Sequence, residues 1–200
     1  MQEVKTIGKD AVHVCVDMQR LFAGETDWHT PSIPEILPNI QRLTRHAPHR
    51  TVFTQFTTPE NPEDALGHWQ VYYRRWTSVT MAQMDPAIID VMDELKDFVP
   101  PARIANKPTY SAFESPEFCE IVDEIGCSTV ICTGVETDVC VLGTVMTAMD
   151  RGYRVIVVSD AVHGSTPASH EATLNHTYRR FEDQIEIGTT DEVIAAWSVA

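Results

Sequence analysis

The feature that most constrains the fold is a regular alternation of short apolar runs with longer amphipathic segments along the whole chain. Val155–Val158 is apolar at every position, as is typical of a parallel strand covered on both faces. Strands are predicted at Val12–Val16, Thr51–Phe56, Ala102–Ala105, Thr129–Thr133, Arg154–Val158 and Gln184–Ile187. Helices are predicted at Ile33–His46, Pro86–Phe98, Pro116–Ile125, Asp138–Arg151, Pro167–Phe181 and Asp191–Trp197. This order predicts an α/β fold with a parallel sheet between helices.

The chain is expected to form a single domain over residues 1–200, because no linker, repeat or low-complexity tract divides it. One connection, Thr57–Met84, is unusually long and contains a polar and aromatic cluster at His68–Trp76. Long connections in compact α/β domains are usually functional, so this segment is predicted to form a lid or a pocket wall.

The charge balance argues against several classes of partner. The chain has 15 Lys and Arg against 29 Asp and Glu, a formal net charge of −14. This sign disfavours nucleic acid and anionic membranes as partners. Because Met1–Lys5 begins no apolar run and no segment is apolar enough to span a bilayer, a cytoplasmic location is expected. The five cysteines are expected to stay reduced, and without a CxxC pair they predict neither a disulfide framework nor a zinc site.

Cys140 differs from the other cysteines in its place along the chain. The apolar run before it ends at Gly134, and the pair Thr137-Asp138, which can cap a helix, follows. The sulfur is then in the first turn of a predicted helix, where the positive end of the helix dipole favours the nucleophilic thiolate. A cysteine is otherwise most often a small buried hydrophobe, which is the interpretation for Cys15, Cys119, Cys127 and Cys132.

Two further charged residues follow predicted strands. Asp17 follows the first strand and Lys107 the third, while Cys140 follows the fourth. In an open parallel sheet ligands bind beyond the carboxyl ends of the strands, so these three side chains are expected at one edge. Individually, Asp17 can cap a turn and Lys107 can be an ordinary surface lysine. Together they supply a base, a fixed positive charge and a nucleophile, the components of covalent acyl transfer.

Three blocks of sequence carry a resemblance to a known family. They are Val16–Gln19 with Phe22 beyond it, Lys107–Phe113, and Gly134–Val141 continuing to Ala161. With these blocks the chain resembles the isochorismatase-like cysteine hydrolase superfamily, over roughly residues 12–181.

The resemblance implies a fold and a set of catalytic groups. The fold is a three-layer αβα sandwich around a Rossmann-like, six-stranded, mostly parallel sheet, in a homo-oligomer that is a dimer or tetramer. The implied catalytic triad is Asp17, Lys107 and Cys140. A cis peptide bond is implied between Val135 and Glu136, with the N–H groups of Glu136 and Cys140 forming an oxyanion hole.

The substrate pocket is less well determined by the sequence. Its expected wall consists of Phe22, Trp69, Tyr73, Trp76 and Val135. Arg74 and Arg75 can either pair with a substrate carboxylate or lie on a solvated helix face.

Departures from the family pattern narrow the chemistry. Nicotinamidases of this superfamily carry Asp-x-His after Thr-Gln to hold a metal, but here Thr54-Gln55 is followed by Phe56-Thr57-Thr58. Neither a metal nor another cofactor is therefore expected, and His68 is interpreted as a loop residue. The vinyl-ether hydrolases that name the superfamily do not use a cysteine nucleophile. The sequence thus predicts hydrolysis of a C–N bond in a small amide, ureide or carbamoyl compound. The alternatives are an isochorismatase-like vinyl-ether hydrolase and a non-catalytic small-molecule-binding module.

Overall fold

A six-stranded sheet forms the centre of the computed structural model, which describes residues 4–199. Its strands are β1 (Ala11–Val16), β2 (Thr51–Phe56), β3 (Arg103–Lys107), β4 (Thr129–Val135), β5 (Arg154–His163) and β6 (Ile185–Gly188). All neighbouring pairs in this sheet are parallel. The predicted α/β class and the parallel sheet are therefore confirmed.

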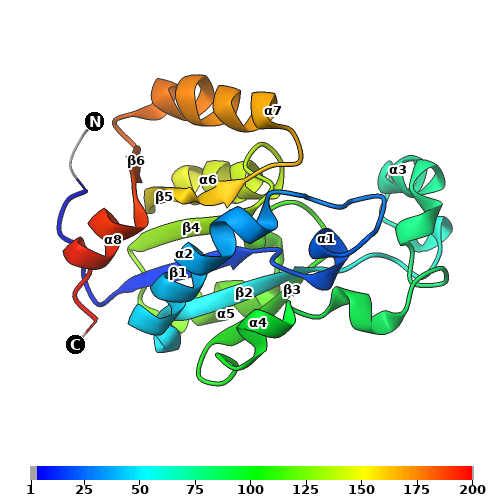
Figure 1. Cartoon of the computed structure of the whole chain (residues 1–200), viewed down its shortest axis with the longest axis horizontal. Helices are drawn as coiled ribbons and strands as arrows, with labels where there is room; N and C mark the ends of the chain where they lie inside the picture. Colours follow the sequence, from blue (N-terminus) through cyan, green and yellow to red (C-terminus); the bar gives the residue numbers. More distant parts are fainter. Residues whose placement is uncertain (1–3, 200) are drawn as a thin grey trace.

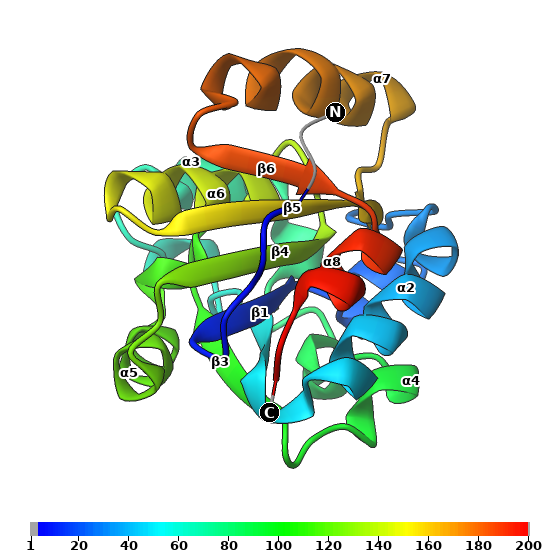
Figure 2. The same ribbon diagram turned by 90° about the vertical axis from the view of Figure 1, so that its left-hand side faces the viewer.

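The order of the strands is β3-β2-β1-β4-β5-β6, so β1 lies between β2 and β4 (Figure 2). The chain adds β2 and β3 on one side of β1, then returns to build β4, β5 and β6 on the other side. The strand order thus reverses between β1 and β4, where Val16 is in register with Gly134. In open α/β sheets this reversal creates a crevice at the carboxyl ends of the strands, where ligands bind.

Helices cover both faces of the sheet. They are α1 (Arg20–Ala23), α2 (Ile33–His46), α3 (Trp69–Arg75), α4 (Asp93–Lys96), α5 (Pro116–Ile125), α6 (Cys140–Asp150), α7 (Pro167–Ala172) and α8 (Thr190–Ala196). Helices α2 and α8 lie on one face, and α5 and α6 lie on the other (Figure 2). This arrangement is the three-layer sandwich expected from the sequence.

The packing of the layers follows from the apolar spacing of each helix. In α6, Val141, Val145 and Ala148 are fully buried against the sheet. Their spacing of three to four residues places them on one face of the helix. Removal of this apolar surface from water stabilises the layer by roughly 25 cal/mol per Å².

The predicted helix Pro86–Phe98 is wrong as a single element. A 3-10 turn covers Pro86–Ile89, and a separate α4 begins at Asp93. Between them Val91 forms an antiparallel bridge with Gln19, just beyond β1. The extended backbone that this long-range pairing needs is incompatible with a continuous helix.

Two other segments also differ from their predicted outlines. The helix expected over Pro167–Phe181 begins as α7, then continues as a π-helical turn at Thr173–Thr177 and a 3-10 turn. Strand β5 continues to His163 instead of ending at Val158, because it pairs with β4 again beyond an irregularity in the register.

The long segment Thr57–Met84 contains α3 between two 3-10 turns. It lies beyond the end of the sheet at which β1 finishes (Figure 1). Tyr73 of α3 is buried, and the Trp28 ring packs against both Tyr72 and Tyr73. The segment is therefore anchored next to the crevice between β1 and β4.

Candidate active site

Asp17, Lys107 and Cys140 meet at the carboxyl edge of the sheet. Asp17 follows β1, Lys107 is the last residue of β3, and Cys140 begins α6 after β4. The Lys107 Nζ is 2.8 Å from the Asp17 Oδ2, and both side chains are fully buried. The thiol of Cys140 lies next to this pair and feels the charge of both side chains. The structure thus brings together a nucleophile, a carboxylate and an ammonium group.

Lys107 reaches the crevice across β2, which separates its own strand from β1. Its Nζ lies 4.6 Å from the centre of the Phe56 ring and donates a hydrogen bond to the Thr109 carbonyl at 3.1 Å. A cation over an aromatic face is attracted by the electron-rich ring. The ion pair with Asp17, the Phe56 ring and the Thr109 carbonyl together fix the ammonium group beside the thiol.

Asp17 is held by a residue that the sequence analysis did not single out. The Thr54 Oγ1 donates to the Asp17 Oδ1 at 2.7 Å and accepts the Asp17 N–H at 3.1 Å. Asp17 has a φ of 52°, in the left-handed region that few residues other than glycine, Asn and Asp adopt. The sequence signal for this role is a threonine near the end of β2, the strand that pairs with β1 and ends beside Asp17.

Thr54→Val is expected to lower activity, because valine keeps the shape of threonine but loses the hydroxyl that holds Asp17, the predicted base. The loss leaves two buried polar groups of Asp17 short of a partner, at a cost of about 1–3 kcal/mol in the free energy of unfolding. We expect a fall in kcat that Thr54→Ser restores, measured alongside urea unfolding. Thr51→Val is the control, because Thr51 is also a buried β2 hydroxyl with two partners, Ala47 and His13. An equal fall in kcat for Thr51→Val would contradict a specific role for Thr54.

The loop between β4 and α6 passes close to β1. Gly134 has a φ of 98°, and a Cβ atom there would lie 2.0 Å from the Val16 carbonyl oxygen, so a glycine is required. The Val135–Glu136 peptide bond that follows is cis, as the family resemblance implies. In the described part of the chain the backbone N–H groups of Glu136 and Cys140 have no hydrogen-bond acceptor. These two donors are therefore free to bind an oxygen atom.

The start of α6 differs from the prediction. The helix begins at Cys140, and neither Thr137 nor Asp138 caps it, because Val139 occupies the N-cap position. The Thr137 hydroxyl instead shares a hydrogen bond of 2.9 Å with the His170 Nδ1. Cys140 is consequently the first residue of the helix, with its own N–H among the unpaired donors of the helix start.

The sequence-based expectation that helix position favours a Cys140 thiolate is wrong for the resting site. Burial raises the pKa of the Cys140 thiol well above its usual value, and the negative charge of Asp17 adds to this, while Lys107 opposes it. Desolvation and the charge of Asp17 together disfavour the charged form more strongly than the ammonium group favours it. Cys140 therefore rests as a thiol.

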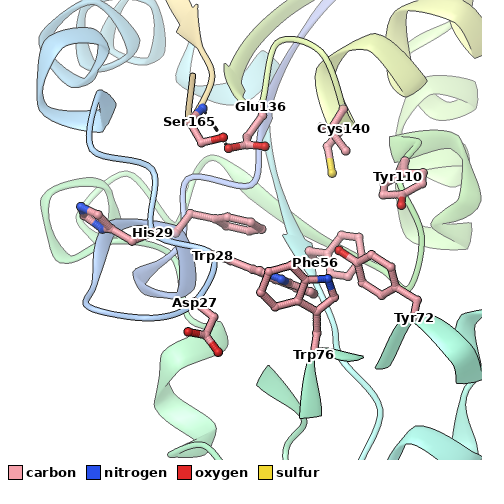
Figure 3. Close-up of a pocket in the computed structure, with 12 residues that line it drawn as sticks. Asp27, Trp28, His29, Phe56, Tyr72, Trp76, Tyr110, Glu136, Cys140 and Ser165 are labelled. Atoms are coloured by element: carbon pink, nitrogen blue, oxygen red, sulfur yellow. Dashed lines mark hydrogen bonds between the residues drawn. The ribbon is translucent and has the colours of Figure 1, made fainter. Parts of the chain in front are cut away.

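The Cys140 thiol opens on a cavity of about 260 Å³ (Figure 3). Its wall is mostly aromatic and consists of Phe22, Asp27, Trp28, His29, Phe56, Tyr72, Trp76, Tyr110, Glu136, Val139, Cys140 and Ser165. Asp17 and Lys107 are fully buried and do not line it. Of the three side chains that meet at the sheet edge, only the thiol lines the cavity.

The residues predicted to line the pocket separate into different places. Phe22 and Trp76 line the cavity at Cys140. Trp69 and Tyr73 line a second cavity, of about 290 Å³. Val135 is fully buried and lines neither.

Trp28 is one of the aromatic residues of this wall that the sequence analysis missed, as are Phe56 and Tyr110. Its ring stacks on Phe22 with centres 6.0 Å apart and meets Phe56 edge-on at 5.7 Å. It lies in the irregular segment between α1 and α2, where no periodic pattern marks it. The sequence signal for Trp28 is its position in the segment that follows β1 and Asp17, shortly after Phe22.

The two arginines considered as partners for a substrate carboxylate lie away from this cavity. Arg74 pairs with Glu63, Arg75 stacks on Trp76, and neither lines the cavity. In residues 4–199 no group of three or more His, Cys, Asp or Glu side chains is placed to hold a metal ion. None of the helices in that range has both the length and the apolar content to cross a bilayer.

Comparison with known proteins finds a matching family and solved structures with the same fold. The isochorismatase domain model matches residues 11–189. Nicotinamidase 3 of Arabidopsis thaliana is 28% identical over 167 residues, which are 83% of this chain and 79% of that protein. A cysteine hydrolase from Pseudomonas syringae pv. phaseolicola 1448A has the same fold, with a TM-score of 0.81 and 22% identity over 98% of this chain and 96% of that one. An isochorismatase-like hydrolase from Alkaliphilus metalliredigens gives a TM-score of 0.75 and 26% identity over 93% and 98% of the two chains.

Proposed function

The chain belongs to the isochorismatase family, and within it we propose that this protein is a cysteine amidohydrolase. Its substrate is a small amide, ureide or carbamoyl compound, and the leaving group is ammonia or an amine. The observation that carries the proposal is the Cys140 thiol at the wall of the cavity, next to the buried Asp17–Lys107 pair.

In the first half of the reaction, Asp17 accepts the thiol proton as the Cys140 sulfur attacks the carbonyl carbon of the substrate. The carbonyl oxygen becomes an oxyanion and binds the free N–H groups of Glu136 and Cys140, each typically worth about 3–4 kcal/mol. Asp17 then gives the proton to the nitrogen, the C–N bond breaks, and ammonia or an amine leaves. The acyl group remains on Cys140 as a thioester.

In the second half, water enters and loses a proton to Asp17 as its oxygen attacks the thioester carbonyl. The same two N–H groups bind the second oxyanion. When the C–S bond breaks, the thiolate takes the proton back from Asp17 and the acid product leaves. The Lys107 ammonium group stabilises whichever of Asp17 and Cys140 carries the negative charge.

The comparisons support amide chemistry over vinyl-ether hydrolysis. The Arabidopsis relative, which matches most of this chain, is a nicotinamidase by name. A cavity of about 260 Å³ suits a compound of small-fragment size, since ligand sites usually begin near roughly 300 Å³. Assembly into a dimer or tetramer stays a prediction.

The experiment that tests the proposal is a screen for ammonia release from small amides, ureides and carbamoyl compounds. We expect at least one compound to release ammonia, and rapid-quench mass spectrometry to find its acyl group on the Cys140 peptide. Undiminished release after alkylation of Cys140 would contradict the thioester route. Formation of pyruvate from a vinyl ether would support the alternative hydrolase, and binding without turnover would support a non-catalytic module.

A further inference from the structure

The Lys, Arg, Asp and Glu side chains that line the cavity at Cys140 are all acidic. Two acidic side chains, Asp27 and Glu136, belong to its wall, and no lysine or arginine does. The nearest buried ammonium, Lys107, is paired with Asp17 outside the cavity. The His29 Nδ1–H donates to the Gly24 carbonyl at 2.8 Å.

Glu136 is held in one orientation at the wall (Figure 3). Its Oε1 accepts hydrogen bonds from the Ser165 N–H at 2.9 Å and from the Thr30 hydroxyl at 3.2 Å. Both bonds use the acceptor capacity of this one oxygen. Its Oε2 has no hydrogen-bond partner in the described part of the chain. One carboxylate oxygen of Glu136 is therefore available to a molecule in the cavity.

The aromatic part of the wall suits the same kind of partner. The rings of Trp28, Tyr72 and Trp76 line the cavity together with Glu136 and Asp27. Arg75 stacks on the Trp76 ring, and the Asp27 Oδ2 accepts a hydrogen bond from the Ser78 hydroxyl. Aromatic faces attract cations, and most strongly where water is excluded. Burial raises the pKa of the Tyr72 phenol, and the neighbouring Tyr110 and Glu136 add to this, so its hydroxyl stays protonated and uncharged.

The reacting end of the cavity has the opposite polarity. The free N–H groups of Glu136 and Cys140 and the positive end of α6 lie where the carbonyl oxygen gains negative charge. A molecule with a carbonyl group at one end and a cation at the other matches both ends. A carboxylate in place of that cation would face Glu136 and Asp27 without a counter-charge.

We propose that the substrate carries a positive charge, on an ammonium, guanidinium or N-alkylated ring nitrogen, which binds Glu136 and Asp27 against the aromatic wall. Glu136 is accordingly the specificity-determining carboxylate, and amides that bear a carboxylate are rejected. The inference rests on the proposed function for the reaction itself, but the charge preference of the cavity is measurable without any turnover.

The test uses two methanethiosulfonate reagents of similar size, one with a trimethylammonium group and one with a sulfonate. In each case the Cys140 sulfur attacks the reagent, a disulfide forms, and methanesulfinate leaves. Peptide mass spectrometry gives the modification rate at Cys140 and, as an internal reference, at the partly exposed Cys119. We expect the ratio of cationic to anionic rates to be at least about tenfold higher at Cys140 than at Cys119, and to fall in Glu136→Gln.

Glu182→Gln is the matched control, since it removes one charge at an exposed position outside the cavity. It should leave the ratio at Cys140 unchanged. Equal ratios at Cys140 and Cys119, or a ratio that survives in the Glu136→Gln Asp27→Asn double variant, would overturn the inference. Loss of the preference in high salt, measured on the unaltered protein, supports it even if a variant fails to fold.

An amide series separates this inference from the proposed function. Nicotinamide, its cationic 1-methyl derivative and 3-carbamoylbenzoate present the same amide on a ring of charge zero, plus one and minus one. Fastest hydrolysis of the cation supports the inference, and fastest hydrolysis of the anion would refute it while leaving the amidohydrolase intact. A Cys140 that reacts with neither thiosulfonate, in a protein that hydrolyses no amide, would refute both.

Discussion

Replacement of Cys140 by alanine is expected to abolish ammonia release while the fold remains. The side chain is the one nucleophile of the proposed reaction that faces the cavity, and it occupies the first position of α6. Loss of a catalytic nucleophile costs on the order of 10⁶-fold in kcat, which brings turnover below detection. Steady-state ammonia assays on the best substrate of the screen measure the loss, and circular dichroism checks the fold.

The matched control for this substitution is Cys132→Ala. Cys132 is a fully buried cysteine of β4, and it does not line the cavity. Both variants remove one buried sulfur, but only Cys140→Ala removes the attacking atom. Cys140→Ser is expected to be as inactive as Cys140→Ala, because a hydroxyl is a much weaker nucleophile than a thiolate. Substantial turnover by Cys140→Ala would contradict covalent catalysis, whatever the state of its fold.

The elements that the sequence located well have strong local signals. Helix α5 has its predicted bounds, Pro116–Ile125. Proline favours the first turn of a helix, and Gly126, with a φ of 63°, adopts the left-handed conformation that ends one. The apolar pattern between those two residues is sufficient to define the helix without tertiary information.

The elements that the sequence located poorly depend on long-range contacts. Met92 donates its N–H to the Met18 carbonyl and Val91 pairs with Gln19, which interrupts the helix expected over Pro86–Phe98. No local pattern in that segment shows that it pairs with the end of β1. Tertiary pairing of this kind overrides local helix propensity.

The features of the candidate site also differ in whether local sequence or long-range contacts determine them. Its three reacting side chains could be found because each follows a recognisable strand, and the ends of parallel strands meet at one edge. The resting thiol of Cys140 could not, since its pKa depends on burial by residues distant in sequence. Trp28 and Tyr110 line the cavity from irregular segments, where no periodic pattern shows which aromatic side chains lie at a cavity.

Substitution of Lys107 by methionine is expected to cost both stability and activity. The Lys107 Nζ and the Asp17 Oδ2 are 2.8 Å apart, and both side chains are fully buried. Methionine has a similar length but no charge, so Asp17 is left as an uncompensated buried carboxylate. Removal of one partner of such a pair typically costs about 3–5 kcal/mol in the free energy of unfolding. An unpaired buried carboxyl group tends to hold a proton, and Asp17 in that form cannot accept one from Cys140.

The double variant Asp17→Asn Lys107→Met separates the two effects. It removes both charges together, so it should recover most of the stability that Lys107→Met loses, because no unpaired charge remains buried. It should recover no activity, because neither the base nor the ammonium group is present. Urea unfolding of the four proteins of this cycle gives the coupling energy, and ammonia release gives the activity. A Lys107→Met protein as stable and active as the parent would show that the ammonium group is not needed. Recovery of activity in the double variant would remove Asp17 from the proposed proton transfers.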